Sequence, residues 1–108
     1  MRTIKIKMLS RRERRNKLEI YNDILMAIRD ESQNGEVRPT RVQLRCNLSY
    51  DKFSNYLEEL KGKDLIKNSL TITSKGQKLL QDYERISQFI KKMQLDYVDV
   101  KEAPYEKY

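Results

Sequence analysis

The apolar residues near the C-terminus of this 108-residue chain recur at alternating spacings of four and three. The pattern runs without a break through Leu79, Tyr83, Ile86, Ile90, Met93 and Tyr97. Such alternation is typical of the seam of a coiled coil, in which two helices pack along one apolar face. We therefore expect a helix over residues 75–97, about 35 Å long, that pairs with the same helix of a second copy. The spacing leaves parallel and antiparallel pairing open, and the alternative is a helix folded back on its own domain.

Positive charge is concentrated at the opposite end of the chain. The formal net charge is +7, and residues 1–17 alone hold eight cations and one acid, a net charge of +7 by themselves. A basic block of this kind favours a polyanionic partner, nucleic acid before an anionic membrane. Because the first twenty positions contain no aromatic residue, we expect neutralisation of duplex phosphates rather than stacking on single-stranded bases. The alternative is a solvated tail.

The residue types exclude several kinds of chemistry. The chain has no histidine and a single cysteine, Cys46, which excludes an internal disulfide, a Cys/His zinc site and His-dependent catalysis. There is no glycine-rich phosphate loop and no convergent acidic cluster. We therefore expect no enzymatic activity, no metal, no cofactor and no small-molecule substrate, and we interpret Cys46 as a small buried hydrophobe. The lack of an apolar leader or spanning segment favours a soluble, intracellular protein.

Three further helices are expected before the C-terminal one. A capping box at Ser10 and Glu13 predicts that the first runs over residues 11–31, with an apolar face made of Leu18, Tyr21, Ile24, Leu25 and Ile28. A second capping box at Thr40 and Gln43 predicts a short helix over 41–46, preceded by a single β-bridge at residues 37–38. Val42 and Leu44 are its candidates for burial. Ser49 is a strong N-cap for a helix over 50–62, with Phe53, Tyr56, Leu57 and Leu60 on one face and Gly62 as the C-cap.

A tight β-hairpin is expected between the third and fourth helices, with strands 65–67 and 70–73 around Asn68 and Ser69. Thr73 or Ser74 then caps the last helix. The fold class is mainly α with a small β-hairpin: a winged helix-turn-helix followed by a long coiled-coil helix. The chain divides into a basic arm (1–10), the winged helix-turn-helix domain (11–74), the dimerisation helix (75–97) and a tail (98–108).

In a helix-turn-helix the second helix lies in the major groove of DNA. Over residues 50–62 we expect Asn55 to contact adenine and Lys52 to contact guanine or phosphate, while Ser49 and the helix start bind a phosphate. Glu58 and Glu59 would face phosphates and count against deep insertion. Further contacts, to the phosphate backbone of the DNA, are expected from Arg11, Arg12, Arg14, Arg15, Arg38, Arg41, Arg45, Lys67 and Lys75. The short hairpin leaves little room for a wing, and the alternative is that it only closes the core.

Several short motifs together resemble a known family. They include Leu48-Ser49-Tyr50 and the run from Leu70 through Lys75-Gly76 to Leu80, and the similarity covers residues 11–95. The chain looks like the small archaeal winged-helix family of chromatin-associated and regulator-like proteins. The resemblance implies a dimer joined by an antiparallel coiled coil and duplex DNA binding of low sequence selectivity. It points to Arg41, Ser49, Tyr50 and Lys52 as DNA-side residues. The chain departs from the pattern in its shorter wing and in Asp64, where many members have glycine.

We therefore expect a homodimeric protein that binds double-stranded DNA in the cytoplasm, as a nucleoid-associated protein or a transcriptional regulator. We expect no binding to a membrane. The rival hypothesis is a winged-helix module that binds another protein, because a fold does not fix a function. Glu58 and Glu59 favour this rival. A basic stripe across residues 50–62 and the arm would support DNA, whereas an exposed apolar patch would support a protein partner.

Overall fold

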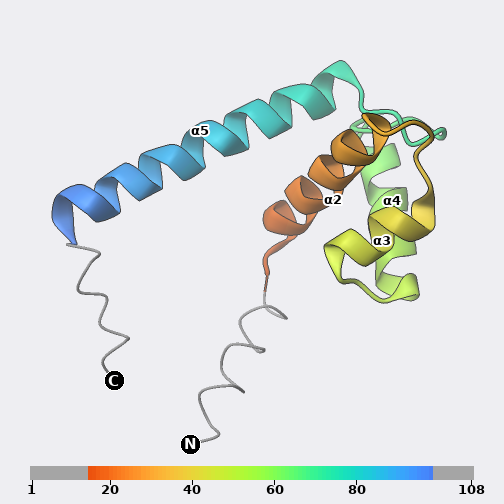
Figure 1. Cartoon of the computed structure of the whole chain (residues 1–108), viewed down its shortest axis with the longest axis horizontal. Coiled ribbons are helices and arrows are strands. Elements are labelled where there is room, and N and C mark those ends of the chain that lie inside the picture. Colours follow the sequence, from red (N-terminus) through yellow and green to blue (C-terminus); the bar gives the residue numbers. More distant parts are fainter. Residues whose placement is uncertain (1–14, 99–108) are drawn as a thin grey trace, which may run out of the picture.

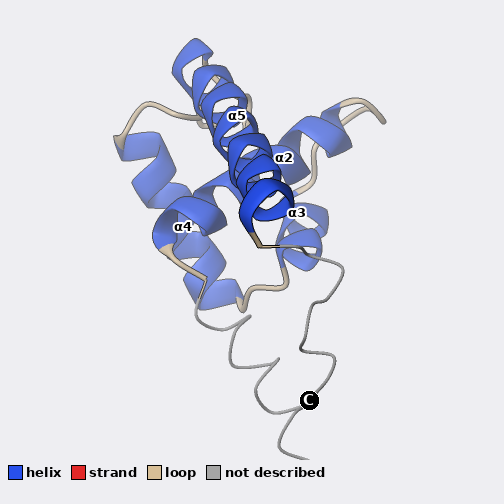
Figure 2. Cartoon of the chain, turned by 90° about the vertical axis from the view of Figure 1, so that its left-hand side faces the viewer, coloured by secondary structure: helices blue, strands red, loops and turns tan. Residues whose placement is uncertain are grey.

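The computed structural model describes residues 15–98, and this range contains four helices. They are α2 (Lys17–Ser32), α3 (Pro39–Cys46), α4 (Tyr50–Gly62) and α5 (Ser74–Tyr97). α2, α3 and α4 form a compact group, and α5 extends away from it (Figure 1). Figure 2 shows only helices and loops among the described residues. The predicted arm and all of the tail after residue 98 lie outside this range.

The core lies between α2, α3 and α4 and is closed by the segment that leads into α5. Its fully buried side chains come from all three helices and are Ile24, Leu25, Ile28, Val42, Phe53 and Leu60. Leu65, Ile66 and Leu70 from the connecting segment and Leu80 from α5 pack onto the same cluster. Burial of one such side chain contributes about 1.5–3 kcal/mol, so the three short helices are stabilised by one another.

Two of the predicted core residues are exposed instead. Leu44 is 72% exposed, whereas Val42 and Cys46 are buried. Residues two apart lie on opposite sides of a helix, and α3 presents to α2 the side that carries Val42 and Cys46. Leu18 is 46% exposed because it lies in the first turn of α2, at the margin of the buried face. The burial predicted for Cys46 is confirmed.

The first two helices begin at other residues than predicted. α2 begins at Lys17, after an extended Asn16 whose side chain accepts a hydrogen bond from the Glu19 amide, 2.7 Å away. The Glu19 carboxylate in turn accepts from the Asn16 amide. A helix continuous from Arg11 to Glu31 is therefore wrong; the Ser10 capping box itself lies outside the described residues.

α3 begins at Pro39, which occupies the first helical position, where its missing N–H leaves no hydrogen bond unmade. The N-cap is Arg38, without a side-chain hydrogen bond, so the capping box predicted at Thr40 is wrong. The β-bridge predicted at residues 37–38 is also wrong, since the isolated bridge found in residues 15–98 joins Ile66 and Ile72.

α4 has the predicted bounds, and its N-cap is Ser49, whose hydroxyl accepts from the Lys52 amide at 3.3 Å. Its C-cap is Lys63 rather than the predicted Gly62, which remains helical. The left-handed conformation that ends the helix falls on Asp64, at φ 62°. This is the position at which many members of the resembling family have glycine.

The predicted β-hairpin is reduced to one bridge. Ile66 pairs with Ile72, and the Lys67 amide donates to the Thr71 carbonyl at 2.8 Å. Leu70, predicted to begin the second strand, instead has a positive φ of 59° and a buried side chain. The backbone at Leu70 therefore turns the chain towards the core, and no strand can continue through it.

α5 is a single helix of 24 residues with Thr73 as its N-cap, one of the two caps predicted. The Thr73 hydroxyl accepts from the Gly76 amide at 3.0 Å. Leu80 is buried, but beyond it the side chains of Ile86, Ile90 and Met93 are exposed. Only the first part of α5 thus packs on the other helices. Within the described range, no helix has both the length and the apolarity to cross a membrane.

Candidate nucleic-acid interface

α3 and α4 are joined by a turn of three residues. Asn47 adopts the left-handed conformation, with φ 56° and ψ 48°, which asparagine tolerates better than most residues. The Gln43 side chain donates to the Leu48 carbonyl at 3.1 Å and fixes the turn. Ser49 then caps α4. These local bonds set two short helices in succession around one tight turn, as in a helix-turn-helix.

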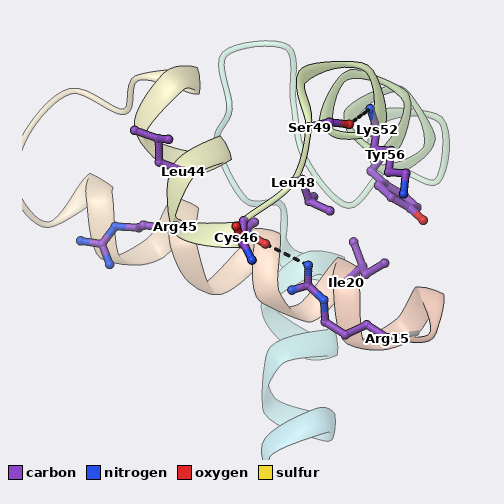
Figure 3. A pocket seen from close by; sticks show the side chains of 10 residues that line it. Arg15, Ile20, Leu44, Arg45, Cys46, Leu48, Ser49, Lys52 and Tyr56 are labelled. Atoms are coloured by element: carbon purple, nitrogen blue, oxygen red, sulfur yellow. Dashed lines mark hydrogen bonds between the residues drawn. The ribbon is translucent and has the colours of Figure 1, made fainter. Parts of the chain in front are cut away.

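A cleft of about 600 Å³ lies beside this turn, between the start of α2 and the facing sides of α3 and α4 (Figure 3). Three of its ten lining residues are cations and none is acidic: Arg15, Ile20, Leu44, Arg45, Cys46, Asn47, Leu48, Ser49, Lys52 and Tyr56. The start of α4, whose backbone amides carry partial positive charge, lies at the same place. Arg15 and Arg45 are paired with the α2 acids Asp23 and Glu31, so an anionic group in the cleft would meet chiefly Lys52 and the start of α4.

Arg15 is bonded on both sides of its guanidinium. Nη1 donates to Asp23 Oδ2 at 2.6 Å, and Nη2 donates to the Cys46 carbonyl at 2.9 Å. The carbonyls of the last turn of a helix have no partner within the helix, so Arg15 satisfies one at the end of α3. This side chain, expected to contact DNA, holds the protein's own turn in place.

Two arginines of α3 converge on one buried carboxylate. Glu31, 4% exposed, accepts from Arg45 Nε at 2.6 Å and lies 3.5 Å from Arg41 Nη1. The hydrogen bond from Arg45 holds the pKa of Glu31 below its ordinary value. Asp30 lies 3.7 Å from Arg45 as well. Both arginines predicted to meet DNA phosphates are therefore paired within the chain.

The outer side of α4 carries Tyr50, Asp51, Lys52, Asn55 and Glu58, all exposed. Asn55 and Lys52, the expected contacts to bases, are thus accessible.

The expectation that Glu59 faces phosphates is wrong. Glu59 turns towards α2, where it accepts from the Tyr21 hydroxyl at 2.6 Å and lies 3.3 Å from Lys17 Nζ. Burial, followed by this hydrogen bond, raises the pKa of Tyr21 to about 12. One of the two acids that counted against DNA contact therefore belongs to the packing between α2 and α4.

The other predicted contacts are more scattered. Arg38 and Lys67 are exposed, and Lys75 is exposed but donates to the Lys63 carbonyl at 2.9 Å. Arg15, Arg45, Ser49 and Lys52 line the cleft, whereas Lys67 lies in the segment before α5 and Lys75 in the first turn of α5. Arg11, Arg12 and Arg14 lie outside the described residues.

The predicted seam of α5 divides into two parts. Leu79 and Tyr83 are partly buried, whereas Ile86, Ile90, Met93 and Tyr97 are 42–80% exposed. Phe89, at 62%, flanks them. Residues 15–98 contain no group of three or more side chains suited to hold a metal ion.

Comparison with protein families gives a match over most of the chain. The model of a family described as winged helix-turn-helix matches residues 14–91. Neither the curated proteins nor the solved structures gave a match. The matched range covers α2, α3, α4 and most of α5, including the turn and the cleft beside it.

Proposed function

Because the chain belongs to the winged helix-turn-helix family, we propose that it binds double-stranded DNA in the cytoplasm, as a nucleoid-associated protein or a transcriptional regulator without enzymatic activity. The observation that carries this proposal is the tight turn between α3 and α4, with the exposed Lys52 and the capped start of α4 beside its cleft. A phosphate of the DNA backbone is the anion that a helix-turn-helix would bring to this position.

The proposed contacts fall into two classes. Asn55, exposed on the outer side of α4, would contact base edges, and Lys52 a base or a phosphate. Phosphate contacts would come from Arg11, Arg12, Arg14, Arg15, Arg38, Arg41, Arg45, Ser49, Tyr50, Lys67 and Lys75. The ion pairs with Glu31 do not prevent this for Arg41 and Arg45, because a guanidinium has five N–H donors.

Two substitutions test the scheme in binding titrations on a random and an A·T-rich duplex. Lys52→Gln removes a cation from the cleft; it should weaken binding to both duplexes by a similar factor if Lys52 contacts a phosphate, and more on the random duplex if it contacts guanine. Asn55→Ala should change the difference in binding free energy between the two duplexes by about 1–3 kcal/mol, the discrimination that one good bidentate base contact provides. Equal loss on both duplexes for Asn55→Ala would contradict base readout by this residue.

We propose further that the chain forms a homodimer through α5. The support is the row of exposed apolar side chains on its second half, Ile86, Ile90, Met93 and Tyr97, at the spacing of a coiled-coil seam. A dimer would present two helix-turn-helix units to the same duplex or to two duplexes. The resemblance described above favours antiparallel pairing.

One observation favours a second function, the binding of a protein partner. Asp51 and Glu58 lie on the outer side of α4, where Tyr50 is 69% exposed, and Leu44 of α3 is 72% exposed. Acidic side chains there oppose a close approach to phosphates. The double substitution Asp51→Asn with Glu58→Gln distinguishes the two functions: it should strengthen DNA binding if α4 lies against the duplex and leave it unchanged if it does not.

A further inference from the structure

Glu31 is a buried carboxylate at the C-terminal end of α2, where that helix meets α3. The residue is 4% exposed, and its Oε2 accepts a hydrogen bond from Arg45 Nε at 2.6 Å. Its Oε1 lies 3.5 Å from Arg41 Nη1 and has no hydrogen-bond partner among the described residues. Burial of a carboxylate is costly unless cations and hydrogen bonds compensate it. The two arginines of α3 are therefore what makes this position tolerable for an acid.

The two arginines themselves remain accessible to a ligand. Arg41 and Arg45 are four residues apart on α3, so they are neighbours on the surface of that helix. Their side chains are 57% and 45% exposed, against 5% for Glu31. Arg45 uses Nε for the bond to Glu31, and its Nη1 lies 3.7 Å from Asp30. Because a guanidinium has five N–H donors, this pairing leaves donors of both side chains for a phosphate.

The buried carboxylate restricts side chains that are otherwise flexible. A free arginine side chain populates many rotamers, and a phosphate contact requires that one of them be selected. Ordering one such side chain during binding weakens the affinity by about two- to tenfold. Because Glu31 holds Arg45 at 2.6 Å and Arg41 at 3.5 Å, part of this ordering is present before any DNA is bound.

We infer that Glu31 is a positioning residue, which holds Arg41 and Arg45 in place on α3 for contacts to phosphates of the DNA backbone. The inference rests on the proposed DNA binding and deepens it, because it gives an acid a favourable role in binding a polyanion. The alternative is that Glu31 only neutralises the two arginines and so weakens DNA binding. The two roles predict opposite effects when the carboxylate is removed.

The test is Glu31→Met in the full chain, with affinity for a random duplex measured by fluorescence anisotropy between about 50 and 200 mM salt. Methionine is unbranched like glutamate but has neither its charge nor its oxygens. Binding at the lower salt concentration should weaken about three- to tenfold although the net charge rises by one. The slope of log affinity against log salt concentration should become shallower by about 1, the value of one phosphate contact. Tighter binding, or a slope that is unchanged or steeper, would overturn the inference.

Glu36→Met is the matched control. Glu36 lies in the loop between α2 and α3 and is exposed, whereas Glu31 is buried. Both substitutions replace the same residue type and raise the net charge by one. We expect the control to bind as tightly as the unmodified chain or slightly more tightly, with the same salt dependence. Glu31→Met binding as tightly as the control would overturn the inference and leave the proposed function standing.

A second comparison tests whether the effect passes through the two arginines. With Arg41 and Arg45 both changed to Gln, Glu31→Met should alter the affinity less than about twofold, since no arginine remains to be positioned. An undiminished loss in this background would overturn the inference.

The conservative variant Glu31→Gln keeps an oxygen that can accept from Arg45 Nε, so it should retain more of the affinity and of the salt slope than Glu31→Met. It also replaces Glu31→Met if that variant does not fold, as judged by circular dichroism. Glu31→Gln binding more tightly than the unmodified chain would overturn the inference. Failure of the unmodified chain to bind DNA would instead overturn the proposed function.

Discussion

Gly76 of α5 fits where no larger residue can. A Cβ atom at this position would lie 2.4 Å from the Leu65 carbonyl oxygen and 2.7 Å from Ile72 Cγ2. The carbonyl belongs to the backbone, so a flexible side chain cannot relieve the contact. Gly76→Ala therefore forces α5 away from the segment that closes the core.

The magnitude follows from two opposing effects. Alanine is favoured over glycine inside a helix by about 1 kcal/mol. Overpacking against a fixed neighbour costs about 1–3 kcal/mol and sometimes more, and a contact with backbone falls at the upper end. We expect Gly76→Ala to lower the free energy of unfolding by about 1–2 kcal/mol, and the melting temperature by roughly 4–8 °C for each kcal/mol.

Urea unfolding followed by circular dichroism measures this difference, with Gly62→Ala as the matched control. Gly62 is the last residue of α4, and a Cβ atom there would meet nothing within 4 Å. The control should therefore be as stable as the unmodified chain or somewhat more stable. A Gly76→Ala protein as stable as Gly62→Ala would refute the argument that close approach, rather than helix propensity, decides this position.

Three further predictions concern other parts of the chain. Because Arg45 lowers the pKa of Glu31 in the folded state, the resulting stabilisation is complete above the ordinary carboxyl pKa of 4.5 and is lost as the pH falls through the lowered value. The difference in urea midpoint between the unmodified chain and Glu31→Gln should therefore shrink on acidification, and a constant difference would contradict the pairing. Ile90→Lys on the exposed seam of α5 should shift sedimentation towards the monomer, whereas Gln88→Lys on the opposite side should not; identical behaviour of the two variants would argue against the seam. Burial raises the pKa of the Cys46 thiol to about 11, so alkylation at pH 8 should require unfolding, and rapid labelling of the native chain would contradict its burial.

Helix positions were largely predictable because each rests on local sequence. Apolar periodicity located α2, α4 and α5, a capping box pointed to α3, and side-chain caps fixed the start of α4 at Ser49 and of α5 at Thr73. The errors arose where two local signals competed. α2 begins after the capping box at Asn16, although Ser10 offered a similar signal, and α3 begins at Pro39, ahead of Thr40.

The partners of the charged side chains were not predictable in the same way. Arg15 bonds to Cys46, 31 residues away, and Tyr21 bonds to Glu59, 38 residues away. No local sequence pattern predicts such pairings, because they depend on how the helices pack against one another. For this reason the cations around the turn could be predicted from the sequence, but their ion pairs with Glu31 and Asp23 could not.

The measurement that tests the central claim most directly is the salt dependence of duplex binding by the unmodified full chain. We predict binding to random and A·T-rich duplexes at low salt, with affinity falling about 10³–10⁵-fold between 50 and 200 mM salt if 6–10 phosphates are contacted. A steep slope on both duplexes would support a phosphate-dominated DNA-binding protein. Absence of binding at low salt would contradict the proposal and turn attention to a protein partner on the outer side of α4.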